Sequence, residues 1–325
     1  MRKTVRWYVW KEHLFSAAGT PDVELKILGR TLAEHTAEKF DAQIVDAFPR
    51  YSSTRNDEIV VVLRSSHTCL PKSGVEALIS RAEAEKKNAF FGAGWILVDG
   101  ENVSLAKYRP LKAGAAFLSL ADYPFVAECL RMEILKRLLR RGVVIENTSG
   151  VYVDATSFIE SGAVLSHDVT VSGKSLIKGG ARIRPYTLIE DSTVSSFAEV
   201  GPFVHLRPDT CVGSYCRIDS FTALKNTALG DGTKAASLSY IGDADVGEKC
   251  NIGCGTLFVD CDGNKKSRSK IGKGCSVGGS VIVAPVAIRD DSCVAAGSLL
   301  SQKVIGGESC IAREKEAVPG NRADK

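Results

Sequence analysis

Aliphatic residues recur at every sixth position over most of the second half of the chain. The first run is Val153, Ile159, Leu165, Val171, Ile177, Ile183 and Ile189. After a step of five residues the series resumes at Val194, Val200, Leu206, Val212, Ile218 and Leu224. With two more such steps it continues through Leu229, Ala235, Ile241, Val246, Ile252 and Phe258, and a last block holds Ile271, Val277, Val283, Ile288 and Val294. A period of six is neither the helical period of 3.6 nor the strand period of two.

A period of six predicts a parallel β-helix, a prism in which each hexapeptide supplies one short strand and one turn. The aliphatic side chain points inward, and a small residue four positions later, such as Ala163 or Thr233, lets the chain turn the corner. Three hexapeptides make one coil, so about 24 units predict roughly eight coils stacked about 4.8 Å apart. The repeat thus predicts a mainly β fold class.

One polar segment, from Val259 to Lys270, breaks the phase of the repeat. An insertion of this kind in a solenoid leaves the prism as a loop, and such loops often carry binding chemistry. We interpret the segment as a functional loop. An insertion that is merely tolerated is the alternative.

The first third of the chain shows the pattern of a small α/β domain. Residues 58–63 (EIVVVL) predict a buried parallel strand, and 75–87 predict the helix that follows it. Residues 90–103 predict a strand pair that turns at Asp99-Gly100. Leu130, Ile134 and Leu138 form one stripe of a helix over 124–141. We therefore expect a reduced nucleotidyltransferase-like α/β domain at 1–123, a linking helix and connection at 124–149, the β-helix at 150–305 and a C-terminal tail at 306–325.

Composition narrows the functional classes. The net charge of +4 is small and its residues are scattered, so we expect no nucleic-acid partner. No apolar run approaches the roughly 20 residues that span a bilayer, and the N-terminus lacks a signal-peptide pattern. We expect a cytoplasmic protein with no membrane partner. None of the ten cysteines forms a Cys-x-x-Cys pair. We therefore predict no metal site and interpret several cysteines as small core residues.

Four stretches of the repeat region closely resemble one family. They are Val200-Gly-Pro-Phe-Val-His-Leu-Arg-Pro208, Leu224-Lys-Asn226, Gly232-Thr-Lys-Ala-Ala-Ser-Leu-Ser-Tyr-Ile-Gly-Asp-Ala-Asp-Val-Gly247 and Asn251-Ile-Gly-Cys-Gly-Thr256. The family is that of the bifunctional N-acetylglucosamine-1-phosphate uridyltransferase/glucosamine-1-phosphate acetyltransferases, and the resemblance covers residues 125–320. It implies a left-handed β-helix, although general rules favour right-handed connections. It also implies a homotrimer with active sites between neighbouring prisms.

The resemblance also implies roles for particular residues. Arg207, Lys225 and Lys266 match the family's contacts to the sugar phosphate, and Tyr240 and Asn251 match residues that orient the sugar and its amine. A further set matches the groove for acetyl-coenzyme A or another acyl-coenzyme A: Cys254, Gly279, Ala296 and Arg313. The implied acceptor is an amino-sugar phosphate or a nucleotide sugar. Cationic side chains suit phosphate because it offers several acceptors and a fixed negative charge.

The chain departs from the family at the catalytic position. Family members read Ala-Gly-His-Leu-Ser/Thr-Tyr, whereas this chain has Ala235-Ala-Ser-Leu-Ser-Tyr240, so Ser237 replaces the histidine that serves as general base. An unaided hydroxyl does not accept a proton at neutral pH. Neither His167 nor His205 is an obvious replacement, and Asp260 as a base is an alternative. Asp260-Cys261 also stands where the family has Asn-Tyr, and Gly279 replaces a serine.

The first third departs further. Residues 14–20 and 21–32 resemble two fragments of the uridyltransferase domain, but the Gly-x-Gly-Thr-Arg-Met stretch between them is missing. Asp22 stands where the family has a lysine that binds phosphate. The strand over 58–63 is followed by Arg64-Ser-Ser-His-Thr68, without the aspartate that holds magnesium. We therefore expect no Mg²⁺ site, with His67 as a metal ligand the alternative, and a loss of uridyltransferase activity.

Three functions compete. The first is an acyl-coenzyme A-dependent N-acyltransferase acting on an amino-sugar phosphate. The second is a non-catalytic relative that binds a sugar phosphate as a sensor, scaffold or partner subunit. The third is a γ-type carbonic anhydrase, which shares the prism. That enzyme needs three zinc-binding histidines, and the repeat region has only His167 and His205.

Overall fold

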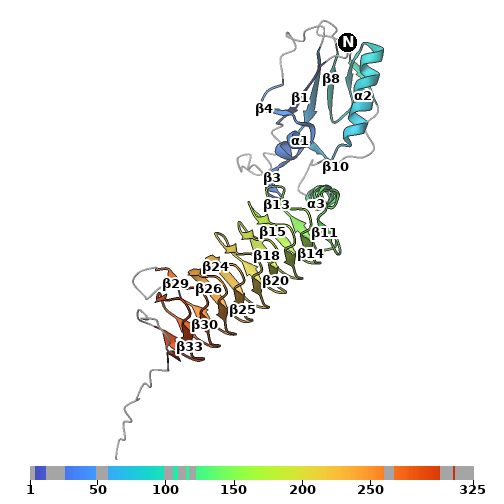
Figure 1. Ribbon diagram of the computed structural model, residues 1–325. Helices are drawn as coiled ribbons and strands as arrows, with labels where there is room; N and C mark the ends of the chain where they lie inside the picture. The colour runs from blue at the N-terminus through green and yellow to red at the C-terminus, as the bar shows by residue number, and fades with distance from the viewer. Residues whose placement is uncertain are drawn as a thin grey trace, which may run out of the picture. The chain divides into compact units, whose positions relative to one another are not determined.

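The computed structural model describes residues 4–11, 26–48, 58–98, 105–108, 115–116, 122–259, 267–300 and 310–311. The chain divides into two compact units, Met1–Lys136 and Arg137–Lys325. The division falls inside the predicted linking helix, which is α3 (Tyr123–Arg140) (Figure 1). Leu130, Ile134 and Leu138 of α3 are buried, as their stripe predicted.

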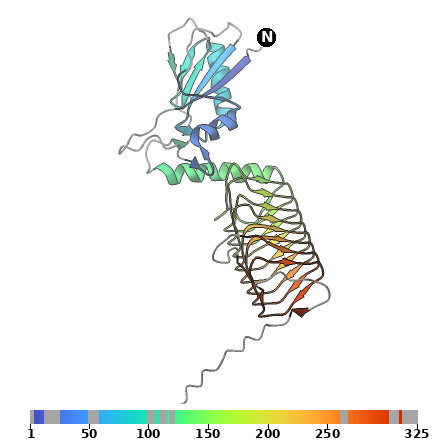
Figure 2. The same ribbon diagram turned by 90° about the vertical axis from the view of Figure 1, so that its left-hand side faces the viewer.

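The second unit is a parallel β-helix whose strands pair with the equivalent strand of the next coil (Figure 2). One sheet has ten strands: β11 (Val144–Ile145), β14 (Val164–Leu165), β17 (Arg182–Ile183), β20 (Glu199–Val200), β23 (Arg217–Ile218), β25 (Lys234–Ala235), β27 (Asn251–Ile252), β30 (Ser276–Val277), β33 (Cys293–Val294) and β35 (Cys310–Ile311). Ten stacked strands show that the predicted count of eight coils is too low. The sheet extends beyond both ends of the aliphatic series, since β11 precedes Val153 and β35 follows Val294.

The other two faces of the prism form one continuous sheet of fifteen strands. They are β12 (Tyr152–Val153), β13 (Phe158–Ile159), β15 (Thr170–Ser172), β16 (Leu176–Ile177), β18 (Leu188–Glu190), β19 (Thr193–Val194), β21 (His205–Leu206), β22 (Cys211–Val212), β24 (Ala223–Leu229), β26 (Tyr240–Val246), β28 (Leu257–Phe258), β29 (Ser269–Ile271), β31 (Ile282–Val283), β32 (Ala287–Ile288) and β34 (Leu299–Leu300). The long strands β24 and β26 join the faces. Each contains a five-residue step of the repeat, with one residue of positive φ between the two inward positions, Asn226 in β24 and Asp243 in β26.

The aliphatic series forms the core of the prism. Every position in it is buried, with no side chain more than 4% exposed. Burying a side chain of this size contributes about 1.5–3 kcal/mol, so the repeat accounts for most of the apolar driving force. Three cysteines, Cys216, Cys250 and Cys275, fill corner positions that elsewhere hold Thr or Ser, and each donates to a backbone carbonyl. The prediction that cysteines serve as small core residues is confirmed for these three.

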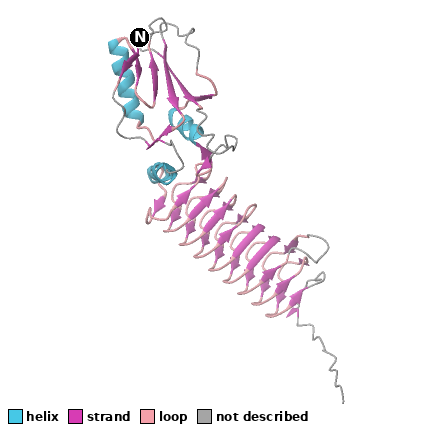
Figure 3. Ribbon diagram, turned by 180° about the vertical axis from the view of Figure 1, so that it is seen from behind, coloured by secondary structure: helices cyan, strands magenta, loops and turns pink. Residues whose placement is uncertain are grey.

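The first unit is built on a six-stranded sheet in the order β4-β1-β5-β8-β7-β9 (Figure 3). Its strands are β1 (Thr4–Trp10), β4 (Gln43–Val45), β5 (Glu58–Arg64), β7 (Asn88–Phe90), β8 (Gly94–Leu97) and β9 (Leu105–Lys107). Two short pairs accompany it: β2 (Lys26–Ile27) with β3 (Arg30–Thr31), and β6 (His67–Thr68) with β10 (Ala115–Ala116). The predicted strand over 58–63 is β5, which pairs in parallel with β1.

Two helices cover one face of this sheet. Helix α1 (Leu32–Phe40) begins at a capping box in which Thr31 accepts from the Glu34 amide and Glu34 accepts from the Thr31 amide. Helix α2 (Lys72–Glu85) matches the helix predicted over 75–87. Phe40 of α1 and Val75 of α2 join the same buried cluster as Val61 of β5, which places both helices on one side. The predicted fold class is confirmed: the chain is mainly β, with a parallel β-helix and a smaller α/β domain.

The predicted hairpin over 90–103 has its turn in the wrong place. Strands β7 and β8 are antiparallel partners and reverse direction over residues 91–93. Gly92 has φ = 81°, a left-handed conformation that glycine adopts without steric cost. The sequence pattern favours a turn at Asp99-Gly100, a common turn pair that lies outside the described residues. The chain instead turns at Gly92, which lets β8 run antiparallel to both β7 and β5.

Candidate functional site

Four of the predicted site residues form one row along a corner of the prism. Ser237, Cys254, Gly279 and Ala296 hold the same corner position in four successive coils. For the first three, the carbonyl accepts a hydrogen bond from an amide at the same corner of the next coil, at 3.0, 2.7 and 2.8 Å. The structure therefore aligns the position of the missing base with the residues predicted to contact the coenzyme. Cys254 is exposed and Gly279 is half-buried, so solvent and a ligand can reach this row.

The Ser237 side chain lacks the neighbours that would activate it. It is half-buried, and its hydroxyl makes no hydrogen bond to any described residue. A serine becomes a nucleophile or proton acceptor only beside a base such as histidine or a carboxylate. No such group is bonded to Ser237 within the part of the chain that the structure describes. The loss of general-base chemistry at Ser237 therefore stays a prediction.

Three of the predicted sugar-phosphate residues lie on the face that follows this corner. Arg207 directly follows β21, Lys225 lies in β24 and Tyr240 begins β26, and these strands are parallel neighbours in three successive coils. Arg207 is exposed, whereas Lys225 is half-buried with its Nζ 3.5 Å from Asp243 Oδ2. The structure thus brings two cations and one aromatic side chain to the same sheet.

Asn251 lies elsewhere. It begins β27 of the ten-stranded sheet, where Lys234 is its register partner. One prism therefore does not bring Asn251 together with Arg207 and Lys225, because they occupy different faces. Lys266 and Arg313 lie outside the described residues.

A polar network beside Lys225 was not predicted. Asp243 accepts from Asn226 Nδ2 at 2.5 Å as well as from Lys225. Arg268, at the end of the predicted loop, donates to the Asn226 carbonyl and to Asp245 Oδ1, both at 2.7 Å. The hydrogen bond from Arg268 lowers the pKa of the Asp245 carboxyl. The sequence shows only that these residues carry opposite charges. Their partners cannot be assigned without the register between the coils.

A second unpredicted pair lies one coil before Lys225. His205 Nε2 is 2.6 Å from Glu190 Oε2, and both side chains are partly exposed. A carboxylate on one ring nitrogen fixes the orientation of an imidazole and leaves the other nitrogen for a ligand. No motif in the sequence links these residues, which are 15 positions apart.

The first unit offers less of a site. His67 lies in β6, with its Nδ1 2.9 Å from Ser66 Oγ. Across the described ranges, no three His, Cys, Asp or Glu side chains gather as a metal site would require. Most of the predicted uridyltransferase fragments, including Asp22, fall outside those ranges, as do Asp260 and Cys261. No helix that the structure describes has the length and apolar character to cross a membrane.

Comparison with known proteins finds relatives over part of the chain. The bifunctional protein GlmU of Trichormus variabilis is 38% identical over 213 residues, which is 60% of this chain and 47% of that protein. GlmU of Clostridium novyi is 35% identical over 206 residues, 58% of this chain and 45% of the relative. No protein-family model matches the sequence.

Among solved structures, the UDP-N-acetylglucosamine acyltransferase from Campylobacter jejuni is 24% identical, with a TM-score of 0.24 over 50% of this chain and 67% of that one. The chain spans about half the length of the GlmU relatives it matches. Over about three fifths of its own length, this protein is a relative of the bifunctional GlmU proteins.

Proposed function

We propose that the β-helix unit is an acyl-coenzyme A-dependent N-acyltransferase that acts on an amino-sugar phosphate, of the glucosamine-1-phosphate acetyltransferase type. The observation that carries this proposal is the alignment of Ser237 with Cys254, Gly279 and Ala296 in one corner row, next to the face that holds Arg207 and Lys225. The residues proposed to contact the donor thus lie next to the face of those proposed to contact the acceptor.

The acceptor contacts follow from charge and hydrogen bonding. Arg207, Lys225 and Lys266 would bind the phosphate, because cations form charge-assisted hydrogen bonds to its oxygens. Tyr240 and Asn251 would orient the sugar ring and its amine. A nucleotide sugar offers the same phosphate chemistry and is the alternative acceptor.

The donor contacts follow from small side chains. Acyl-coenzyme A supplies an activated thioester, and Cys254, Gly279, Ala296 and Arg313 would hold it along the corner. The corner is tightly packed at Gly279, where a Cβ would lie 3.0 Å from the Cys254 carbonyl oxygen. The row would therefore suit the narrow, unbranched arm of the coenzyme. An arginine such as Arg313 suits the phosphates of the coenzyme.

A homotrimer is part of the proposal, because one prism leaves Asn251 on a different face from Arg207 and Lys225. The outward side chains of three register partners on the face that holds Tyr240 are also apolar. Leu257, Ile282 and Leu299 are 42, 42 and 62% exposed in one chain. A continuous exposed apolar row marks a surface that another protein covers. A second copy would cover the row and complete the site. A cytoplasmic location also belongs to this proposal.

A second function is favoured by Ser237 itself. A relative that kept its phosphate contacts and lost its base would bind the sugar phosphate without acylating it, as a sensor, scaffold or partner subunit. The two functions differ in one measurable step, the release of the coenzyme thiol.

The test uses the full chain with glucosamine-1-phosphate and acetyl-coenzyme A, and follows free thiol. We expect slow release by the parent and a faster rate in Ser237→His, because general-base help is worth about 10²- to 10⁴-fold. Ser220→His is the matched control, since Ser220 holds the same corner one coil earlier. Thiol release by the parent contradicts the non-catalytic function. No release by parent or Ser237→His, with binding of both ligands measured, contradicts the acyltransferase.

The proposal includes loss of uridyl transfer. The strand β5 ends at Arg64, and residues 65–68 after it have no carboxylate to hold Mg²⁺. Incubation with UTP, Mg²⁺ and N-acetylglucosamine-1-phosphate should therefore release no pyrophosphate. Enzyme-dependent pyrophosphate release would contradict this part of the proposal.

A further inference from the structure

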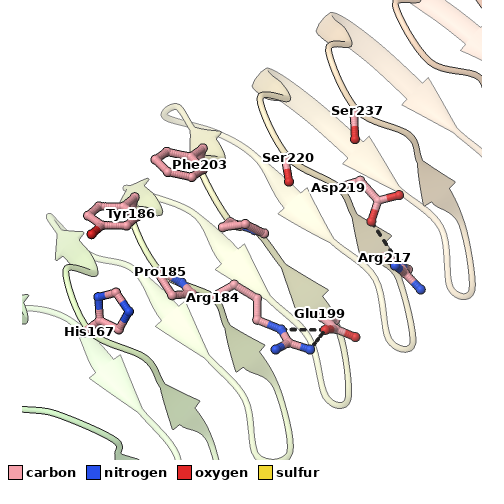
Figure 4. A pocket seen from close by; sticks show the side chains of 12 residues that line it. His167, Arg184, Pro185, Tyr186, Glu199, Phe203, Arg217, Asp219, Ser220 and Ser237 are labelled. Carbon is pink, nitrogen blue, oxygen red and sulfur yellow. Dashed lines mark hydrogen bonds and ion pairs between the residues drawn. The ribbon is translucent and has the colours of Figure 1, made fainter.

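A groove of about 590 Å³ runs along the β-helix from Ser237 toward the first coils (Figure 4). Its size is within the range of small-molecule sites. Tyr186 and Phe203 line one wall, and Arg184 with Glu199 and Arg217 with Asp219 form the other. Two prolines, Gly201, Ser220 and His167 also line it, and His167 Nδ1 is 2.9 Å from Asp168 Oδ2. Apart from Ser237, none of these residues belongs to the sugar-phosphate or coenzyme contacts proposed above.

The charged wall is balanced. Arg184 binds Glu199 through Nε at 2.6 Å and through Nη2, and Arg217 Nε donates to Asp219 Oδ1 at 2.9 Å. Two arginines and two carboxylates leave no net charge on this wall. A guanidinium has five N–H donors and a carboxylate about four acceptor positions, so each pair keeps unused donors and acceptors. These side chains are 34–62% exposed, so a ligand can reach them.

The aromatic wall presents edges rather than faces. Tyr186 and Phe203 stack with ring centroids 4.8 Å apart and 11° between their planes, and Phe221 covers the other face of Phe203 at 5.1 Å. The row therefore offers a rigid apolar edge with one phenolic hydroxyl. Such a wall contacts C–H groups, while Ser220 and Ser237 supply further hydroxyls on the same corner.

This combination selects among ligand classes. A fatty acyl chain would remove water from four charged groups without replacing their hydrogen bonds, which is costly. An anion would meet two carboxylates as well as two arginines, so it gains little. A neutral ring with several hydroxyls uses the unpaired donors and acceptors and places its C–H groups against the aromatic edge. We infer that this groove binds a neutral sugar ring.

The inference is separate from acyl transfer, because it concerns a ligand without phosphate and, apart from Ser237, other residues. Its test is binding of glucose, N-acetylglucosamine and maltose to the full chain, measured by calorimetry and saturation-transfer NMR. Inorganic phosphate and decanoate are the competing probes. We expect weak binding of the sugars and no binding of decanoate at this groove.

Two variants locate the site. Glu199→Gln and Asp219→Asn each remove one negative charge at nearly unchanged shape. Each should weaken neutral-sugar binding about tenfold or more, since a hydrogen bond to a charged group is lost. Each should also improve phosphate binding, because an arginine loses its partner. Tyr215→Leu is the matched control, as Tyr215 stacks on Phe197 outside the groove. Its sugar binding should equal that of the parent.

Three results would overturn the inference. They are no sugar binding by the parent, unchanged sugar binding in both charge variants, and displacement of the sugars by decanoate. Thermal unfolding of each variant shows that the fold is kept, which we expect because the altered side chains are partly exposed. Thiol release, measured separately, reports on the acyltransferase alone, so failure of one proposal leaves the other open to its own test.

Discussion

At the scale of single residues, the cysteines of the β-helix fall into two groups. Among the described residues, Cys216, Cys250 and Cys275 point into the prism, whereas Cys211, Cys254 and Cys293 are exposed. Burial raises the pKa of the Cys216 and Cys250 thiols to about 11 and also raises that of Cys275. A thiol reacts as the thiolate, so burial and a raised pKa both protect the inner group.

Alkylation should separate the two groups. At pH 8 in native protein, iodoacetamide should modify Cys211 and Cys254 and leave Cys216 and Cys250 unmodified, as measured by peptide mass spectrometry over time. All four should react in denaturant, which serves as the control. Modification of Cys250 as fast as that of Cys254 in native protein would contradict the described burial.

The Asp245–Arg268 ion pair joins the end of the predicted loop to the prism. Because the folded-state pKa of Asp245 is lowered, the pair stabilises the fold above the carboxyl's ordinary pKa. The contribution is lost as the pH falls through the lowered value. Asp245 is 45% exposed, so the effect is that of a surface pair, about 0.2–1 kcal/mol.

Asp245→Asn should therefore lower stability at pH 7 by that amount and have almost no effect at pH 2. Urea unfolding at the two pH values, followed by circular dichroism, measures the difference. Asp209→Asn is the control, since the Asp209 carboxylate is exposed and has no side-chain partner among the described residues. An equal loss at both pH values would show that the pair is not the cause.

At the scale of elements, the β7–β8 hairpin depends on close backbone approach. Gly94 of β8 is the register partner of Leu63 in β5, and a Cβ at Gly94 would lie 2.3 Å from the Val62 carbonyl oxygen. Gly94→Ala should destabilise the first unit by about 1–3 kcal/mol, as expected for overpacking.

Tryptophan fluorescence measures this effect selectively, because Trp7, Trp10 and Trp95 all lie in the first unit. The midpoint of urea unfolding seen by fluorescence should fall. Glu76→Ala, at an exposed position of α2, is the control and should leave the midpoint nearly unchanged. A Gly94→Ala midpoint equal to that of the parent would contradict the described register.

At the scale of the whole molecule, the proposed trimer should depend on the apolar row of Leu257, Ile282 and Leu299. Sedimentation equilibrium should give the parent a mass three times that of one chain. Ile282→Arg should shift it toward the monomer, because a charge would be buried in an apolar contact. Ser73→Arg, at an exposed position of α2 in the first unit, is the matched control and should remain trimeric. A monomeric parent, or a trimeric Ile282→Arg variant, would contradict the proposal.

Much of the β-helix was predictable because its information is local. A side chain every six residues must point inward if stacked coils are to have a core, and all positions of the series from Val153 to Val294 are buried. The replacement of the family's base by Ser237 is also a fact of the sequence alone, since it needs only an aligned motif.

The tertiary structure decided what depends on register between coils. It set the hairpin turn at Gly92, because β8 must lie against β5. It placed Asn251 in the ten-stranded sheet and Lys225 in the fifteen-stranded sheet, on different faces of the prism. It also paired Arg268 with Asp245, and it formed the groove between two ion pairs and an aromatic row. The members of these ion pairs are 2 to 23 positions apart, and most of them are brought into contact by the stacking of coils.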